Sequence, residues 1–95
     1  MENNIYISSL YDIYGKLLTD TQRNYFEDYY FNNYSLSEIS ENYNVTRNAI
    51  HKSLKETEKN LRNFEEKLGY FEKLKKIKIL DIKEEIKEKI IDIFE

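Results

Sequence analysis

The sequence predicts an all-α fold, a small helical bundle with extended C-terminal helices. Three observations support this prediction. The 95 residues include no Pro and only two Gly, Lys and Glu are abundant, and apolar residues recur at spacings of three and four along most of the chain. A chain of this length usually folds around a single core. We therefore expect one helical domain over residues 1–69 and a helical extension over residues 70–95.

The composition argues against several classes of protein. The absence of Cys excludes a disulfide framework and a zinc finger, and a single His argues against an all-protein metal site. Paired acidic residues have no nucleophile or metal partner around them, so we expect no enzyme activity, no catalytic residue and no cofactor. The N-terminus lacks the segments of a signal peptide, and no stretch approaches the roughly 20 apolar residues of a membrane span. We expect a cytoplasmic protein that does not insert into membranes.

The charge is distributed unevenly along the chain. The net charge is −3, which opposes strong non-specific binding to nucleic acid, because neutralisation of phosphates by Lys and Arg dominates that affinity. Residues 1–34 carry five acidic and two basic residues, whereas residues 46–55 carry three basic residues and no acidic one. Arg47 is one of only three Arg beside twelve Lys. The sequence therefore concentrates positive charge in one short segment.

The first two helices are predicted by an apolar stripe and a capping signal. Residues at spacings of three and four predict a helix from about Ile5 to Leu17, with the stripe formed by Ile7, Leu10, Tyr11, Tyr14, Leu17 and Leu18. Thr19 and Gln22 fit a capping box at the start of a second helix, from Asp20 to about Phe31. We expect this helix to bury Phe26, Tyr29 and Tyr30.

A second capping box predicts a short third helix. Asn32 and Asn33 end the preceding helix, because Asn tolerates left-handed backbone. Ser35 and Glu38 then form the capping box of a helix over Leu36–Asn42. We expect its inward side chains to be Leu36, Ile39 and Tyr43.

A turn and a long fourth helix follow. Asn44 stands where a positive φ is needed, Val45 is expected in the core, and Thr46 is a good N-cap. Apolar residues then recur on one side of a helix that ends at Gly69, a typical C-terminal cap; they are Ile50, Leu54, Leu61, Phe64 and Leu68.

The other side of this long helix is basic near its start. At about 100° per residue, one broad sector contains Arg47, Asn48, His51, Lys52, Lys55, Lys59 and Arg62. A short helix, a tight turn and a second helix with a basic first half form the layout of a helix-turn-helix, whose second helix can enter a DNA major groove. The candidate DNA-binding residues are Thr46, Arg47, Asn48, His51, Lys52 and Lys55.

Each candidate side chain has a role that its chemistry suits. Arg47 is suited to two acceptors of a guanine edge and Asn48 to an adenine edge, whereas Thr46, Lys52 and Lys55 are better placed for phosphates. The competing interpretation is a solvated polar face with no ligand, and His51 in particular fits an ordinary surface histidine.

The C-terminal segment predicts one long helix or two shorter ones, with Asp81 a candidate restart. Ile82, Ile86, Ile90 and Ile93 lie at spacings close to those of a coiled coil. Such a stripe needs a partner surface, so it either folds back on the long helix or packs against a second chain. We expect a homodimer formed through these helices.

Five short sequence motifs resemble those of a known family. They are LYDIYG at residues 10–15, LLT at 17–19, QRNYF at 22–26, SLSEI at 35–39 and EEKLG at 65–69. With them, residues 10–74 resemble the small bacterial YlxM-type helix-turn-helix proteins, which are similar to region 4 of sigma-70 factors. Two positions depart from the family pattern: Asn44 replaces the usual turn Gly, and Lys52 is basic where the family has an acidic residue.

The resemblance implies a sigma-like helix-turn-helix in a DNA-binding or regulatory protein linked to the signal recognition particle pathway. The positions that match its recognition helix are Thr46, Arg47, Asn48, His51 and Lys52. The alternative is an accessory module that contacts the particle's protein, its receptor or its RNA without reading DNA sequence, which the negative net charge favours. A third function, as a partner of RNA polymerase, rests on the sigma likeness alone.

Overall fold

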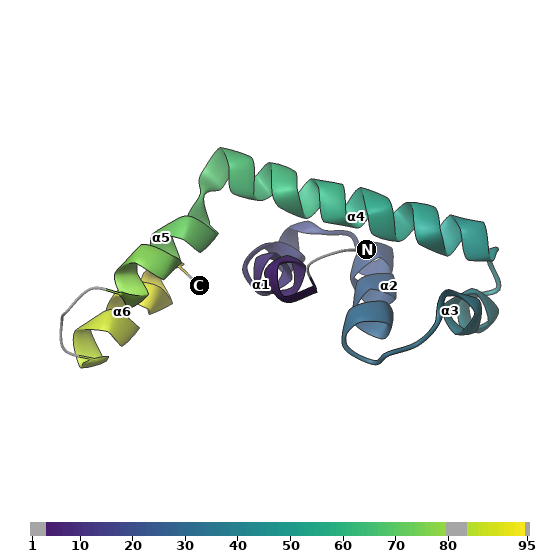
Figure 1. The fold of residues 1–95 in the computed structure, drawn as a ribbon, viewed down its shortest axis with the longest axis horizontal. Coiled ribbons are helices and arrows are strands. Elements are labelled where there is room, and N and C mark those ends of the chain that lie inside the picture. Colours follow the sequence, from purple (N-terminus) through teal and green to yellow (C-terminus); the bar gives the residue numbers. More distant parts are fainter. Residues whose placement is uncertain (1–3, 80–83, 95) are drawn as a thin grey trace.

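The computed structural model describes residues 4–79 and 84–94, and every regular element in them is helical (Figure 1). The elements are α1 (Asn4–Tyr14), a 3-10 turn η1 (Gly15–Leu17), α2 (Asp20–Tyr30), α3 (Leu36–Tyr43), α4 (Arg47–Leu68), α5 (Tyr70–Lys78) and α6 (Glu84–Phe94). The all-α prediction is confirmed.

α4 is the longest element and organises the others. Its 22 residues correspond to about 33 Å at 1.5 Å per residue. α1, α2 and α3 all pack against it, and α3 lies at its N-terminal end (Figure 1). At the other end the chain turns at Gly69 into α5, which contacts α1. One helix therefore runs the length of the bundle and connects its two ends.

The predicted capping signals are present in the structure. Thr19 and Ser35 each form a complete capping box, with Gln22 and Glu38 respectively. The Thr46 hydroxyl accepts a hydrogen bond from the Ala49 amide at 3.0 Å and so caps α4. The expected left-handed residues are confirmed as well: φ is 59° at Asn33, 54° at Asn44 and 66° at Gly69. Local sequence thus determines where these helices begin and end.

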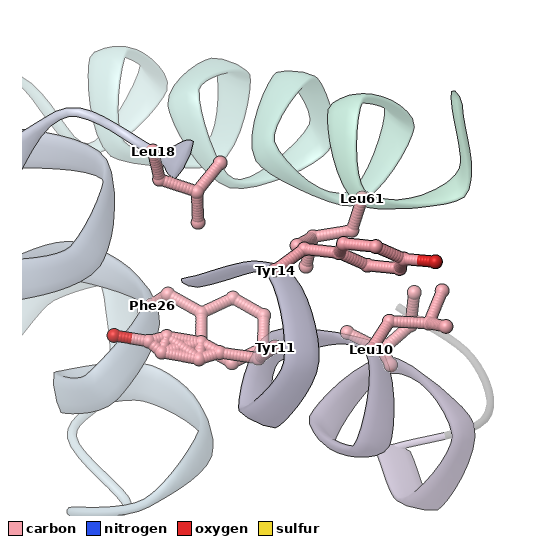
Figure 2. Packing of buried hydrophobic residues seen from close by; sticks show 7 residues of the cluster. Leu10, Tyr11, Tyr14, Leu18, Phe26 and Leu61 are labelled. Atoms are coloured by element: carbon pink, nitrogen blue, oxygen red, sulfur yellow. The ribbon is translucent and has the colours of Figure 1, made fainter. Parts of the chain in front are cut away.

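The core consists of two clusters along α4. The larger one joins α1, α2 and the second half of α4 (Figure 2) and contains Ile7, Leu10, Tyr11, Tyr14, Leu18, Phe26 and Leu61. In it the rings of Tyr11 and Phe26 stack with centroids 4.4 Å apart. The smaller cluster holds α3 against the first half of α4 and contains Tyr25, Ile39, Ile50 and Leu54.

Two burial predictions near the turn are wrong, and two in α2 hold only in part. Val45 is 38% exposed, whereas Ile39 and Ile50 on either side of the turn are fully buried. Tyr43 is 40% exposed; its ring packs edge to face on Tyr25, and its hydroxyl donates to Asp28 Oδ2 at 3.2 Å. In α2, Tyr25 is buried, whereas Tyr29 and Tyr30 are only half-buried.

The C-terminal segment forms two helices, and α6 packs against α5. The edge of Phe94 meets the Tyr70 ring, with centroids 5.8 Å apart. The described part of the stripe thus folds back on α5, which neither of the two expected partner surfaces, the long helix or a second chain, included. Asp81 and Ile82, named in the predicted restart and stripe, lie outside the described residues.

A buried carboxylate fixes the corner between α4 and α5. Tyr14 donates from its hydroxyl to Glu65 Oε1 at 2.6 Å and accepts from the Tyr70 amide at 3.1 Å. The two carboxylate oxygens of Glu65 also accept from the Phe71 and Glu72 amides, at 3.0 and 3.3 Å. Gly69 has no side chain with which to cap α5, so Glu65 caps it from one turn earlier. The pKa of Tyr14 is raised to about 12; burial is the larger cause, and the hydrogen bond to Glu65 is the next.

Removal of this hydroxyl should destabilise the protein. Tyr14→Phe leaves the ring in place but removes the donor to a buried carboxylate, so we expect the free energy of unfolding to fall by about 1–3 kcal/mol. Urea denaturation followed by circular dichroism measures it. Tyr34→Phe, at an exposed tyrosine, is the matched control and should change stability by less than about 0.5 kcal/mol. Equal midpoints for the two variants would contradict this account of the corner.

Candidate nucleic-acid interface

The helix-turn-helix is formed by α3, the turn at Asn44 and the first half of α4. Ile39, Ile50 and Leu54 are fully buried, so the two helices cross on a solid apolar contact. In the turn, the Val45 amide donates to the Ser40 carbonyl oxygen at 3.0 Å, and left-handed Asn44 reverses the chain. The crossing fixes the start of α4 relative to the rest of the bundle.

All six candidate residues lie at the start of α4 and all are exposed; they are Thr46, Arg47, Asn48, His51, Lys52 and Lys55. Arg47, His51 and Lys55 are spaced by four residues and form one line along the helix. Asn48 and Lys52 form a second line beside it. The structure thus brings the candidates together on one continuous surface of about two and a half turns.

Charge at the start of α4 differs from that of α2 and α3. α2 and α3 carry Asp20 and Glu38 in their first turns, where a negative charge offsets the positive end of the helix dipole. α4 has no acidic residue there and begins with Arg47 instead. A cation at this position opposes the dipole and costs stability, so Arg47 is not explained by helix stability.

The three arginines also differ in their partners. Arg23 pairs with Asp20, and Arg62 lies 4.0 Å from Glu58. Arg47 forms no ion pair with any residue that the structure describes. The same holds for Lys52 and Lys55 within residues 4–79 and 84–94. The basic sector is therefore least neutralised at the start of α4 and is compensated further along, at Arg62.

Two groups in α3 have pKa values moved by their surroundings. Hydrogen bonds from the Ser35 amide and hydroxyl lower the pKa of Glu38, so the carboxylate of the capping box stays ionised. Burial and the hydrogen bond to Asp28 raise the pKa of Tyr43. The hydrogen bonds that cause these shifts hold α3 in place, and neither shift marks a catalytic group.

Leu36 is a member of this surface that the sequence did not reveal. It was expected to point inward, but it is only half-buried and lines a hollow together with Arg47, Asn48 and His51. The signal was its position directly after the α3 N-cap, since in a helix-turn-helix this end of the first helix lies near the start of the second. Its apolar character alone suggested the core.

Other kinds of site find no support in the described part of the chain. No helix there is long and apolar enough to cross a membrane. Among the same residues, no three His, Cys, Asp or Glu side chains lie together in a way that could hold a metal ion.

Comparison with known proteins defines the class of this chain as a helix-turn-helix protein. A model of the UPF0122 family, described as "Putative helix-turn-helix protein, YlxM / p13 like", matches residues 1–94. The chain belongs to this family, which is not an enzyme family.

Individual relatives agree with the family model. A UPF0122 protein of Desulforamulus reducens is 54% identical over 67 residues, which cover 70% of this chain and 57% of the relative. One from Thermoanaerobacter sp. is 52% identical over 65 residues, covering 68% of this chain and 56% of the relative. One from Caldanaerobacter subterraneus is 48% identical over 82 residues, covering 84% and 70%. The matches to the first two therefore span less than two thirds of those relatives.

Reversal of the charge at the start of α4 should stabilise the fold. Arg47→Glu places a carboxylate at the positive end of the helix dipole, so we expect the free energy of unfolding to rise by about 0.5 kcal/mol. Lys67→Glu, in the last turn of the same helix, is the matched control and should lower it by a similar amount. Denaturant unfolding at low ionic strength compares the two variants. A stability loss for Arg47→Glu would show that Arg47 serves the fold.

Proposed function

We propose that this protein binds DNA in a sequence-specific manner and acts as a regulatory factor. The observation that carries the proposal is the position of Arg47: it is the first helical residue of α4, it opposes the helix dipole, and it lacks a carboxylate partner among the described residues. A solvated polar face does not account for such a placement, whereas an anionic ligand that completes the surface does. Membership of a helix-turn-helix family supports the same function.

In this proposal the first half of α4 enters the major groove. Arg47 donates to the O6 and N7 acceptors of guanine, and Asn48 pairs with the N6 and N7 groups of adenine. Lys52, Lys55 and the Thr46 hydroxyl contact phosphates. The Thr46 oxygen already accepts the Ala49 amide, so its own proton is free to be donated to a phosphate oxygen. His51 lies on the same line as Arg47, one turn further along α4, and also faces the groove.

We further propose that two copies associate through their C-terminal helices. α6 has no buried residue among those described, and two of its isoleucines are strongly exposed, Ile86 by 46% and Ile93 by 82%. The chain is also extended: its radius of gyration is 15.7 Å, against about 12 Å for a compact chain of this length. A second copy would cover this apolar surface.

The surface of α5 offers a complementary site for that association. A groove of about 410 Å³ runs between α1 and α5, with an apolar lining that includes Ile13, Phe71 and Leu74. Lys75 and Lys78 flank it. The groove lining also includes Asp12, so its two lysines leave it with a net positive charge. The first turn of α6 carries two carboxylates, on Glu84 and Glu85, so the α6 of one copy and the groove of the other have opposite net charges.

A second candidate function is favoured by the net charge of −3, which is unusual for a protein that binds DNA alone. In this alternative the bundle is an accessory module that contacts the signal recognition particle protein, its receptor or its RNA. Pull-down with the purified particle protein and RNA separates the two functions. A regulator that only binds DNA would retain neither.

The DNA-binding proposal predicts a specific pattern of variant effects. Duplex fragments are first selected from a random pool with the parent protein, and affinities are then measured by electrophoretic mobility shift. Arg47→Ala should weaken binding by about 1–3 kcal/mol and relax specificity at one position, because it removes a bidentate base contact. Lys52→Ala should weaken binding equally to all sequences and reduce the salt dependence.

Lys67→Ala, at the far end of α4, is the control for this series and should bind as the parent does. If Arg47→Ala and Lys52→Ala also bind as the parent does, α4 does not enter the groove. If the parent selects no fragment even at low salt, the proposed DNA-binding function itself is excluded.

The association through α6 predicts that a charge on its exposed face dissociates the dimer. Ile86→Lys places an ammonium group in the apolar interface, so we expect sedimentation to show a monomer where the parent is a dimer. Glu88→Lys, on the same helix and also exposed, introduces the same group outside the isoleucine stripe and should leave the dimer intact. Unchanged mass in both variants, or a monomeric parent, would exclude association through this stripe.

A further inference from the structure

Leu36 occupies an unusual place on the candidate interface. It is the first residue of α3, and it lines a hollow of about 280 Å³ on the exposed surface of the helix-turn-helix. The other lining residues are Arg47, Asn48 and His51, which come from the first two turns of α4. An apolar side chain thus lies among three side chains that donate hydrogen bonds.

The position of Leu36 is fixed by the core beneath it. It packs against the cluster of Tyr25, Ile39, Ile50 and Leu54, yet it remains half-buried. The capping box of Ser35 and Glu38 holds the backbone on either side of it. Leu36 therefore presents an apolar surface of fixed position beside Arg47, and any ligand that enters the hollow must meet it.

The chemistry of the major groove restricts what this ligand is. The edges of guanine, adenine and cytosine present only hydrogen-bonding groups, whereas thymine presents one apolar group, its C5 methyl. A polar base edge placed against Leu36 would lose hydrogen bonds to water without replacement. A methyl group placed there removes apolar surface from water on both sides.

From this geometry we infer that Leu36 is a specificity-determining residue, which contacts the C5 methyl of a thymine in the DNA site. The inference rests on the proposed function, since it requires the start of α4 to lie in the major groove. The thymine then neighbours the bases contacted by Arg47 and Asn48, and the recognised sequence combines purines with an adjacent thymine. α3 takes part in base recognition, in addition to the recognition helix.

Replacement of thymine by uracil tests this contact without any change to the protein. Uracil lacks only the methyl group, so base pairing and the other groove atoms are retained. A fragment selected by the parent protein is synthesised with thymine or with uracil at every such position, and both forms are titrated. We expect binding to the uracil form to be weaker by about fourfold for each half-site in the fragment, the factor for one buried methyl-sized group.

Leu36→Ala completes the cycle. This variant should bind the thymine and uracil forms equally, at close to the affinity of the parent for uracil DNA. Leu17→Ala, at an exposed leucine outside the helix-turn-helix, is the matched control and should keep the fourfold difference. Single thymine-to-uracil changes should place the whole effect at one position in each half-site.

Three outcomes would overturn the inference. If the parent binds DNA with equal affinity in both forms, the proposed function stands and the thymine contact fails. If Leu36→Ala keeps the fourfold difference, another residue contacts the methyl group. If the parent binds neither form, the proposed function itself fails. The first measurement uses only the parent protein, so a folding defect in Leu36→Ala does not prevent the test.

Discussion

The buried face of α4 is the constraint on which the rest of the structure depends. Ile50 and Leu54 on its first half belong to the cluster that holds α3, and Leu61 on its second half belongs to the cluster that holds α1 and α2. A single helix therefore belongs to both cores. Since a helix is rigid over this length, the exposed face of its first turns is presented in an orientation that the whole bundle sets.

Polar groups divide the two cores, and they explain much of what the sequence could and could not predict. Thr57 and Glu58 lie on the buried side of α4, where the apolar stripe is interrupted between Leu54 and Leu61, and Glu65 lies on the same side beyond Leu61. Helical spacing places residues 57 and 58 on that face, but their polarity conceals this in the sequence. Among the described residues the buried Thr57 hydroxyl forms no hydrogen bond, and Glu58 lies 4.0 Å from Arg62 on the same helix. The Glu65 carboxylate accepts hydrogen bonds from Tyr14 and from the amides of α5, and none of these contacts has a local sequence signal.

By contrast, the capping boxes and left-handed turns depend on neighbours within a few residues, so the predictions at Thr19, Ser35, Asn44 and Gly69 are confirmed. Periodicity gives the face of a helix but not how far a neighbouring helix covers that face. For this reason the burial of Glu65 was missed and the burial of Val45, Tyr43 and Leu36 was overestimated.

The candidate interface combines local and tertiary information in the same way. Its charge is visible in the sequence, because Arg47, Lys52 and Lys55 lie within ten residues that lack an acid. The structure adds that these cations have no carboxylate partner in the described residues, whereas Arg23 and Arg62 do. It also adds Leu36, which only the crossing of α3 and α4 brings beside Arg47. The family match covers residues 1–94, but the family's description names no target, so the target has to be argued from this surface.

The small number of cations sets a quantitative limit on how one copy can bind DNA. Each neutralised phosphate contributes about −0.9 to the slope of log affinity against log salt concentration. Two lysines, Lys52 and Lys55, give a slope of about −1.8 for one copy and about −3.6 for two. With so few phosphate contacts on a chain of net charge −3, a single copy gains little from electrostatics, and its affinity for DNA has to come from base contacts or from a second copy.

The length of α4 restricts the geometry in which a second copy could help. The helix separates the proposed DNA-binding end from the α5 and α6 end by about 33 Å, so the proposed dimer joined at α6 would position its two binding ends only through two rigid helices. Half-sites on one face of DNA repeat about every 34 Å, and the angle at the Gly69 corner would therefore decide which multiple of that repeat such a dimer could span. In the proposed complex, the Tyr14 and Glu65 contacts that fix this corner would influence half-site spacing as well as stability, although they lie at the opposite end of α4 from the proposed base contacts.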